Sequence, residues 1–354
     1  MHNWKVSVFT CILAAGLLAG CGQAEKVDGT QTALTVNGEE ISMGTAVFTL
    51  RYQQAETTGV MEQYGMDQNG LLWNQDGGTD EEGKAQTYGD LIKQTIQNSI
   101  VQQVLLRQHA GDYGVEVSPE IQEMMDATAK ETYEANAETL EKIGTTEENI
   151  RESLELSSWT LLLKDAMTAD VDPVVSDEEA AQSTISYARL TKNKETDGEE
   201  KLDEENPLTN AEKQALMEEF LAALQAEENP AEADFATLAK DINEEIFTNE
   251  YSFGSDNEYL ATEVIAAAAR LSDGEFDEEV IETEDGHYYV VRMDKVFDKE
   301  ATDEQKKNIL SNRKQEAYDA LLQEWTDAAE ITTTPAWDEV KLTDADKWTD
   351  QAAE

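Results

Sequence analysis

The pair Asp172-Pro173 divides the sequence into two parts that predict different secondary structure. Proline has no amide hydrogen, and its ring clashes with the preceding turn, so a helix does not continue smoothly through it. Before the pair, apolar residues recur every three or four positions, as they do on one face of a helix. After it, short runs rich in β-branched and aromatic residues alternate with helical segments. The chain is therefore expected to be α+β, with a largely helical first part.

The first part predicts one strand pair and three or four helices. Apolar residues alternate on both sides of Asn37-Gly38, which is a strong hairpin signal. A helical pattern follows the hairpin, and residues 64–90 are expected to form a long loop because they are rich in Gly, Asp and Asn. Further helices are expected from apolar periodicity, a proline in the first turn or a capping box: over 89–109, from Ser118-Pro119, and from Thr145-x-x-Glu148 to about Ala169.

The second part predicts the order β-α-α-α-β-β. The expected elements are a strand from Ile185 to Leu190, a helix capped by Thr209-x-x-Glu212, a short helix from Ala233 to Ala239, a helix from Tyr259 to Leu271, and strands Glu279–Thr283 and His287–Met293. Residues 193–208 and the segment around Tyr251 are expected to be loops. Thr302-x-x-Gln305 predicts the start of a last long helix, and the weak alternation over 331–342 allows one more strand.

The N-terminus predicts export. One charge, Lys5, precedes an apolar run from Val6 to Ala19, which is too short to span a bilayer and has the length of a signal-peptide core. The run ends in Leu18-Ala19-Gly20-Cys21, which resembles the bacterial lipobox and implies cleavage before Cys21 and lipid attachment to its sulfur. The alternative is a plain secretory signal that contains a cysteine.

Cysteine and charge exclude several function classes. After cleavage only Cys21 would remain of the two cysteines, so disulfides, zinc and cysteine redox chemistry are excluded. The 26 Lys and Arg against 76 Asp and Glu give a formal charge of −50, which repels nucleic acid and anionic lipid heads. The acidity is expected to form a solvated exterior, or to attract basic unfolded chains or loosely held cations. No spaced ligand set indicates a metal site, and no Gly-rich phosphate loop indicates a nucleotide, so no cofactor is expected.

Several short motifs occur together in an informative order. They are VNGEEIS at 36–42, Asp234-Phe235-Ala236-Thr237-Leu238-Ala239, Leu271-Ser272-Asp273-Gly274-Glu275-Phe276, and Val280, Thr283, Gly286 and Val290-Val291. They resemble parvulin-type prolyl isomerase domains and, with the lipobox, extracytoplasmic foldases of the PrsA and SurA kind. In that family a parvulin domain is inserted between an N-terminal helical lobe and a C-terminal helix.

The resemblance implies a domain organisation. Residues 1–20 would be a signal peptide, 21–32 a tether, 33–172 a helical chaperone lobe, and 183–298 an inserted parvulin-like domain with a small antiparallel sheet. Residues 302–342 would be a C-terminal helix that completes the lobe, and 343–354 an acidic tail.

The resemblance also places candidate site residues and exposes departures from the family. The final-strand histidine of the family falls at Tyr288, and the first-strand histidine at Ala188. Because successive strand residues face opposite sides, His287 is expected to point away from the pocket, as a solvent-edge residue, while Tyr288 has either a pocket or a core role. The remaining candidates are Glu245 as a catalytic charge and Leu260, Val264 and Phe253 as the proline-binding wall.

The function expected from the resemblance is that of a lipid-anchored chaperone on the outer face of the cell membrane. Its partners would be unfolded or newly exported polypeptides, and its isomerase domain would be weak or inactive because both histidines are lost. One alternative is an active peptidyl-prolyl cis-trans isomerase. Others are a solute-binding lipoprotein, disfavoured because repeated βαβ alternation is missing from the pattern, and a structural envelope lipoprotein.

Overall fold

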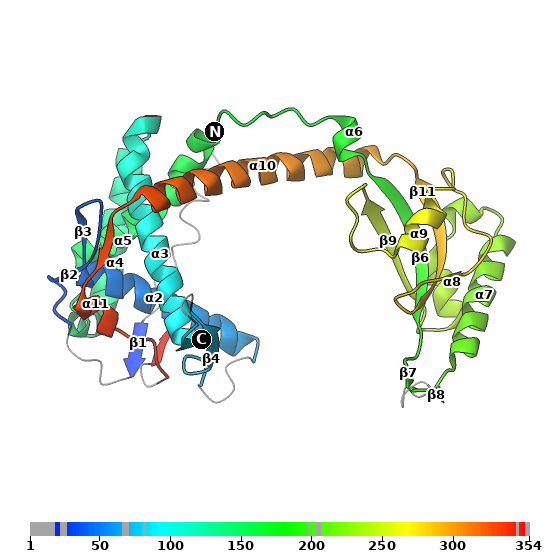
Figure 1. The fold of residues 1–354 in the computed structure, drawn as a ribbon, viewed down its shortest axis with the longest axis horizontal. Helices are drawn as coiled ribbons and strands as arrows, with labels where there is room; N and C mark the ends of the chain where they lie inside the picture. The colour runs from blue at the N-terminus through cyan, green and yellow to red at the C-terminus, as the bar shows by residue number, and fades with distance from the viewer. Residues whose placement is uncertain are drawn as a thin grey trace. The chain divides into compact units, whose positions relative to one another are not determined.

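The chain folds as α+β and forms two compact units (Figure 1). The computed structural model describes residues 18–21, 27–65, 71–80, 83–196, 199–202, 207–344 and 347–350. Unit 1 comprises Met1–Val171 and Lys314–Glu354, and unit 2 comprises Asp172–Arg313. Helix α10 (Lys299–Ala328) begins in unit 2 and ends in unit 1.

A hairpin near the start of unit 1 forms two strands of a small sheet. Strands β2 (Thr32–Val36) and β3 (Glu39–Ser42) are joined by Asn37 at φ 52° and Gly38 at φ 83°, the left-handed pair that a two-residue hairpin requires. Strand β12 (Ile331–Thr333), from the other end of the chain, pairs antiparallel with β2, giving the order β12-β2-β3. The predicted hairpin is confirmed, and so is the strand allowed after residue 330.

Helices make up most of unit 1. They are α2 (Met43–Gln63), α3 (Tyr88–His109), the 3₁₀ turn η1 (Ala110–Tyr113), α4 (Pro119–Lys142), α5 (Glu147–Met167) and α11 (Pro335–Glu339). The cap of α5 lies one residue later than predicted. Thr146 and Asn149 form its capping box, whereas the Thr145 hydroxyl is buried and donates to the Gly44 carbonyl at 3.0 Å.

The segment predicted as a long loop after residue 64 contains structure. Strands β4 (Asp76–Thr79) and β5 (Ala85–Thr87) pair antiparallel, and Trp73 is buried with its ring 5.8 Å from that of Tyr88. Composition suggested a loop because Gly and Asp dominate, but the buried tryptophan anchors the segment to the start of α3. Residues 66–70 and 81–82 lie outside the described residues.

The C-terminal segment is fixed to unit 1 by a tryptophan. Trp337 on α11 is fully buried, and its indole N–H donates to the Gln97 side chain at 2.8 Å. Lys93 on α3 lies with its ammonium 4.9 Å from the Trp337 ring centre and donates to the Trp337 carbonyl at 2.6 Å. Burying an aromatic ring of this size stabilises by several kcal/mol. Helix α3 and the C-terminal segment, 240 residues apart in the sequence, are therefore joined in one core.

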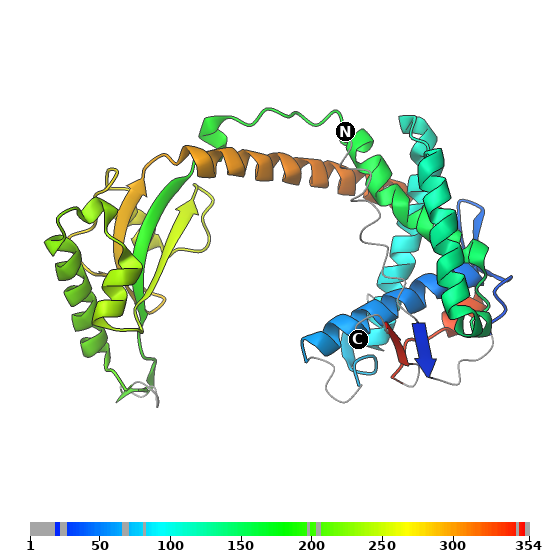
Figure 2. The same ribbon diagram turned by 180° about the vertical axis from the view of Figure 1, so that it is seen from behind.

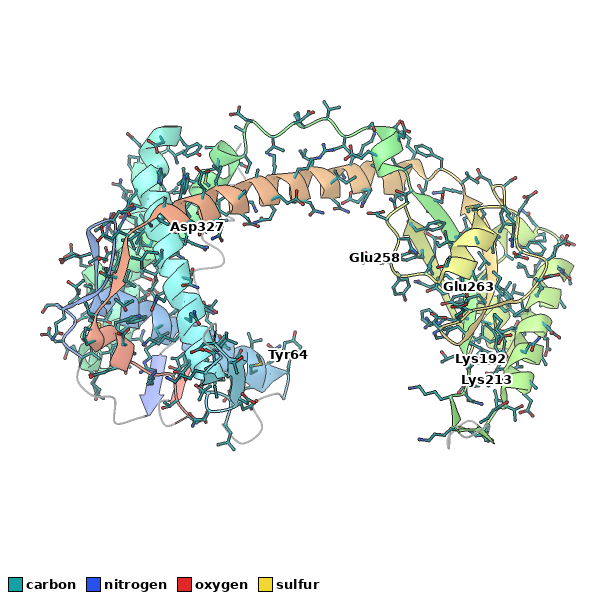
Figure 3. The ribbon with its side chains drawn as sticks, in the orientation of Figure 1. Tyr64, Lys192, Lys213, Glu258, Glu263 and Asp327 are labelled. Atoms are coloured by element: carbon teal, nitrogen blue, oxygen red, sulfur yellow. The ribbon has the colours of Figure 1, made fainter. Side chains whose placement is uncertain are left out.

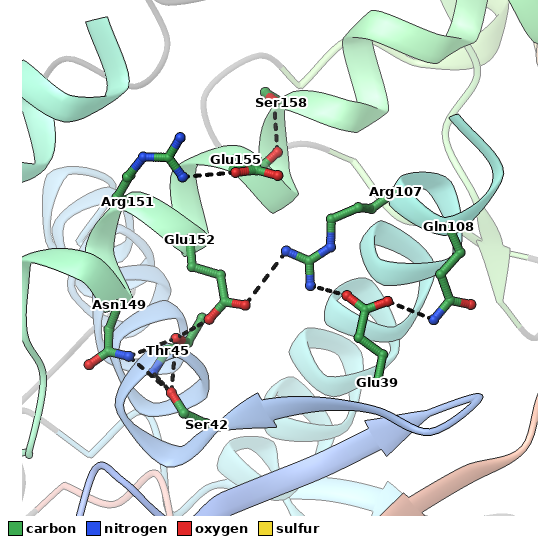
Figure 4. A network of polar contacts seen from close by, with 10 residues as sticks. All are labelled: Glu39, Ser42, Thr45, Arg107, Gln108, Asn149, Arg151, Glu152, Glu155 and Ser158. Atoms are coloured by element: carbon green, nitrogen blue, oxygen red, sulfur yellow. Dashed lines mark hydrogen bonds and ion pairs between the residues drawn. The ribbon is translucent and has the colours of Figure 1, made fainter. Parts of the chain in front are cut away.

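A polar network holds the VNGEEIS hairpin against the helices (Figure 4). The Arg107 guanidinium pairs with Glu39 on β3 and lies 3.5 Å from the Glu152 carboxylate on α5. Glu152 in turn accepts from the Thr45 hydroxyl at 2.7 Å, and Asn149 donates to Thr45 at 3.1 Å. The motif residues thus serve to lock hairpin, α2, α3 and α5 together.

Residues near the N-terminus depart from the expected tether. The Gly29 carbonyl accepts from the Gly44 amide at 3.0 Å, and the Gln31 carbonyl accepts from the Met43 amide at 2.7 Å. Residues 27–31 are therefore held against unit 1 rather than free. Strand β1 (Leu18–Cys21) pairs with β13 (Lys347–Asp350), so part of the expected acidic tail is a strand. Residues 1–17, most of the expected signal peptide, and 22–26 lie outside the described residues.

Unit 2 is built on a four-stranded antiparallel sheet in the order β10-β11-β6-β9. The strands are β6 (Ser183–Thr191), β9 (Phe247–Phe253), β10 (Ile281–Glu282) and β11 (His287–Lys295). The predicted order lacked β9, because that segment was expected to be a loop. A short hairpin of β7 (Glu195–Thr196) and β8 (Glu199–Glu200) follows β6.

Helices cover both faces of this sheet (Figures 1 and 2). Helices α7 (Asn210–Ala226) and α8 (Phe235–Ile242), with the 3₁₀ turn η2 (Pro230–Glu232) between them, pack on one face. Helix α9 (Thr262–Ala268) packs on the other, and is shorter than predicted. The capping box of α7 at Thr209 and Glu212 is confirmed. The sheet therefore has two separate cores, one on each face.

The start of α10 closes unit 2. The Asp298 carboxylate accepts from the amides of Glu300 and Ala301 at 3.0 and 3.3 Å, so it caps the helix. It also accepts from the Thr184 hydroxyl on β6 at 2.9 Å. Thr302, predicted to be the cap, is instead buried inside the helix, and its hydroxyl accepts from the Gln182 amide at 3.1 Å. Short helix α6 (Asp177–Ala180) precedes this junction.

Candidate functional site

The two faces of the unit 2 sheet carry different side chains. On the face covered by α9, here called the α9 face, the core consists of Ile185, Tyr187, Leu260, Val264, Ala268, Tyr289, Val291 and Met293. On the α7/α8 face the core includes Ala188, Leu190, Met217, Phe220, Phe235, Tyr288 and Val290. Strand alternation places neighbours such as Tyr288 and Tyr289 in different cores.

The expected orientation of the two strand-entry residues is wrong. Tyr288 is buried against α7 and α8, and it does not share a face with Leu260 and Val264. Its partner across the sheet is Leu190, and the Lys192 ammonium lies 5.5 Å from its ring centre. Burial raises the pKa of the Tyr288 hydroxyl. The pairing of β6 with β11 sets this register, so Tyr288 acts as a core residue.

His287 lies on the α9 face instead of pointing away from it. Its ring meets that of Tyr289 edge-on, with centres 6.0 Å apart, and its side chain is only 19% exposed. Its buried Nδ1 has no hydrogen-bond partner among the described residues, and Nε2 is 3.9 Å from the Asp285 carboxylate. Burial lowers the pKa of His287, while Asp285 opposes the decrease. A neutral imidazole is therefore favoured here more than at an exposed site.

Two tyrosines fill the middle of the α9 face. The rings of Tyr187 and Tyr289 lie 5.5 Å apart. Burial raises the pKa of both hydroxyls, and Arg189 opposes the increase at Tyr289. The Arg189 guanidinium lies 5.0 Å from the ring centre of Phe247 on β9. These rings occupy the space in which the resemblance placed a proline pocket.

The aromatic side chains of the α9 face that lie near β9 are exposed to solvent. Phe247 is 46% exposed and Tyr259, in the loop before α9, is 59% exposed. The Tyr259 ring lies 5.0 Å from that of Tyr251 on β9, and Phe253 at the end of β9 packs partly buried against the α9-face core. The α9 face thus offers an aromatic surface that continues to the sheet edge.

The remaining candidates do not converge on one point. Glu245 is exposed in the turn before β9, and its backbone amide donates to the Asn243 side chain at 2.9 Å. Leu260 and Val264 are buried below α9 and present little surface to a ligand. A shallow cavity of about 580 Å³ beside α9 is lined by Ala261, Thr262, Glu263, Ala266, Glu284 and Asp285. Three of these six side chains, Glu263, Glu284 and Asp285, are acidic.

Unit 1 exposes a second group of apolar side chains, here called the unit 1 apolar group: Val60, Tyr64, Leu71 and Leu91. They come from the end of α2, the segment after it and the first turn of α3. The Gly89 amide donates to the Trp73 carbonyl at 2.9 Å, so the segment after α2 adjoins the start of α3. Figure 3 labels Tyr64, which is 71% exposed at the end of α2.

Three other observations bear on the candidate site. Cys21 forms the end of β1 through its backbone, opposite Lys347. Over the described ranges, no helix has the length and apolar character needed to cross a bilayer. Nor do three His, Cys, Asp or Glu side chains come together there as metal ligands would.

Sequence reasoning missed the residues that define the α9 face: Tyr187, Arg189, Phe247, Tyr251, Tyr259 and Tyr289. The signal was present in FTNEYSF at 247–253, where aromatic residues recur with the even spacing of a strand.

Comparison with known proteins gives structural neighbours but no family assignment. No protein-family model matches the chain, and no curated protein matches its sequence. Solved structures that resemble the chain at low similarity include foldases and SurA-like chaperones.

The foldase protein PrsA of Streptococcus pneumoniae is 17% identical, at a TM-score of 0.31 over 73% of this chain and 96% of that one. A SurA-like chaperone structure from Campylobacter jejuni is 11% identical, at 0.29 over 86% and 99%. The peptidylprolyl isomerase PrsA of Bacillus cereus is 16% identical, at 0.29 over 75% and 96%.

Proposed function

We propose that the protein is an extracytoplasmic chaperone that binds unfolded exported polypeptides and needs no cofactor. The observation that carries the proposal is the exposure of apolar and aromatic side chains on an otherwise strongly acidic surface in each unit. The unit 1 apolar group and the aromatic surface beside β9 are both open to solvent. Exposed apolar surface of this kind is typical of interaction sites.

The acidic exterior suits such a role. A net charge of −50 keeps the protein soluble although apolar side chains are exposed. It also attracts basic segments of unfolded chains over a distance set by the ionic strength. Apolar contact then supplies the affinity, while the acidic residues of the surrounding surface favour positively charged clients.

The lipid anchor is part of the proposal. Leu18-Ala19-Gly20-Cys21 supports cleavage before Cys21 and acylation of its sulfur. Two acyl chains on one residue would hold the protein firmly at the membrane, whereas a single chain anchors weakly. The chaperone would then act on the outer side of the membrane, where exported chains emerge.

A test replaces the exposed apolar side chains of unit 1. Tyr64→Ser and Val60→Ser, separately and together, should reduce the suppression of client aggregation in a light-scattering assay. Val174→Ser is the matched control, because Val174 is 71% exposed and lies outside the apolar group. Unchanged suppression in the double variant would contradict a client-binding role for this surface.

Prolyl isomerisation is the second candidate, and His287 is the observation that favours it. A largely buried imidazole beside Tyr289 could position a proton donor or acceptor on the α9 face. Against it, Tyr187 and Tyr289 fill the face where a proline ring would bind. Catalysis needs groups already organised around the twisted amide. We therefore place the isomerase second.

The isomerase candidate has its own test. The slow, proline-limited refolding phase of a client should keep its uncatalysed rate in the presence of the wild-type protein. A faster phase that His287→Ala returns to the uncatalysed rate would favour the isomerase instead. His287→Ala should leave aggregation suppression unchanged, which separates the two activities.

A further inference from the structure

Strand β9 is an unprotected edge of the unit 2 sheet. It is seven residues long and, among the described residues, pairs only with β6, in a continuous register from Ser183 opposite Phe253 to Arg189 opposite Phe247. It lies outermost on its side of the sheet in both views (Figures 1 and 2). The opposite edge strand, β10, has only two residues. Proteins commonly shorten, bulge, charge or place proline in edge strands to prevent pairing. Of these devices β9 shows only a charge, Glu250.

The outer backbone groups of β9 are free to pair. In an antiparallel sheet, alternate residues of an edge strand direct their N–H and C=O groups away from the neighbouring strand. Over the described part of the chain, the backbone of 247–253 has hydrogen bonds to β6 alone. One side of the edge is aromatic, since Phe247 and Tyr251 lie on the α9 face and Tyr259 stands over Tyr251.

Charge around this edge selects the occupant. Residues 243–258 contain five acidic residues, Glu244, Glu245, Glu250, Asp256 and Glu258, and no basic residue. Two basic side chains from other strands also lie near β9: Arg189 lies over the Phe247 ring, and Lys295 donates to Asp298. All five acidic residues are exposed, and Figure 3 labels Glu258 in the loop that follows β9. A second copy of this chain pairing through β9 would bring like charges together, which is unfavourable.

We propose that β9 binds an extended client segment by adding it to the sheet as a fifth strand, and that the segment carries basic side chains alternating with apolar ones. Main-chain hydrogen bonds to β9 supply affinity that does not depend on sequence. Apolar side chains on alternate positions contact the aromatic surface of Phe247, Tyr251 and Tyr259. Basic side chains pair with Glu250 and its acidic neighbours. This inference rests on the proposed chaperone function and specifies one mode of client binding.

The test uses the full chain and three labelled ten-residue peptides. The first alternates lysine and valine, the second alternates glutamate and valine, and the third is the lysine peptide with N-methyl groups on alternate amides. Fluorescence anisotropy should show the first binding at least about tenfold more tightly than either of the others. The third peptide keeps all its charge, so it isolates the backbone hydrogen bonds from general attraction to an acidic protein.

Hydrogen exchange locates the bound peptide. The lysine peptide should slow exchange of alternate amides within 247–253 and leave α7 unaffected. Glu250→Lys should weaken binding about tenfold, whereas Glu219→Lys, the same charge change at an exposed position on α7, should change it by less than about twofold. Equal binding of the methylated peptide, or protection elsewhere without protection in β9, would overturn the proposal.

Proline substitution gives an independent check. Thr248→Pro and Asn249→Pro remove adjacent amides, of which one faces β6 and the other faces outward. The variant that loses the outward-facing amide keeps its pairing with β6, so it should keep its thermal transition and lose peptide binding. If both lose the transition, the methylated peptide still decides the question. If the wild-type protein suppresses client aggregation but does not bind the peptide at β9, only this inference is refuted. If the wild-type protein does not suppress client aggregation, the proposed chaperone function is refuted.

Discussion

The contacts of Asp298 at the start of α10 allow a quantitative prediction about the stability of unit 2. Asp298→Ala removes the cap of α10, which is worth about 1 kcal/mol. It also removes the 2.9 Å hydrogen bond from the Thr184 hydroxyl, which keeps the Ser252 hydroxyl as a partner at 2.8 Å, at a further cost of about 1 kcal/mol. The Lys295 ammonium, 2.8 Å away, is half exposed and adds little. The expected loss is about 2 kcal/mol, or about 4–8 °C in the unfolding transition of a unit this size.

The same site predicts a pH dependence. The Lys295 hydrogen bond is the largest cause that lowers the pKa of Asp298, with Thr184 and two backbone amides adding to it, from 3.8 to about 2. Because the folded-state pKa is the lower one, the stabilisation is complete above about pH 4 and disappears as pH falls toward 2. The stability difference between wild type and Asp298→Ala should shrink over that range.

Differential scanning calorimetry of the full chain at several pH values measures both effects. Asp298→Asn is informative because asparagine can still cap a helix, so it should lose less stability than alanine at pH 7. Asp303→Ala is the control, since Asp303 is a more exposed carboxylate on the same helix and its loss should change little. A difference below about 0.5 kcal/mol for Asp298→Ala that does not vary with pH would refute the reasoning.

Four further substitutions test other parts of the structure. Tyr288→Ala should cost about 3–5 kcal/mol in chemical denaturation because the ring belongs to the α7/α8 core, whereas His287→Ala should cost much less; equal losses would contradict the assigned faces. Burial lowers the pKa of Lys93 to about 8, so the unfolded chain binds this proton more tightly than the folded one. The wild type should therefore gain stability relative to Lys93→Met as pH rises from 8 to 10.5, by on the order of 2 kcal/mol. A stability difference that stays constant over this range would argue against the buried charge. Cys21→Ala should abolish labelling by a fatty-acid analogue and release the protein from membranes; unchanged fractionation would exclude the anchor.

Local signals in the sequence predicted much of the fold. Asn37-Gly38 specified the hairpin because only a left-handed pair makes its turn, and Thr209 with Glu212 marked the start of α7. The position of the break at Pro173 is close to the boundary between the units at Asp172. These features depend on a few neighbouring residues, so they can be read without tertiary information.

Errors arose where distant contacts decide the outcome. Thr145 and Thr302 both match capping boxes, yet each hydroxyl is buried and bonds to a segment about 100 or more residues away. The faces of β11 depend on its register with β6, which local composition does not encode. The evenly spaced aromatic residues of β9 favour a strand, but the place of β9 in the sheet depends on its pairing with β6. The α9-face tyrosines were missed for the same reason.

Direct binding of an unfolded client is the most direct test of the proposed chaperone function. A basic client protein that is reduced and carboxamidomethylated, so that it cannot refold, can be mixed with the full chain in sedimentation velocity experiments. We predict a complex with the unfolded client and none with its native form, weakened by high salt because acidic side chains contribute to the affinity. Equal binding of both forms, or no complex with the unfolded client at low salt, would contradict the account.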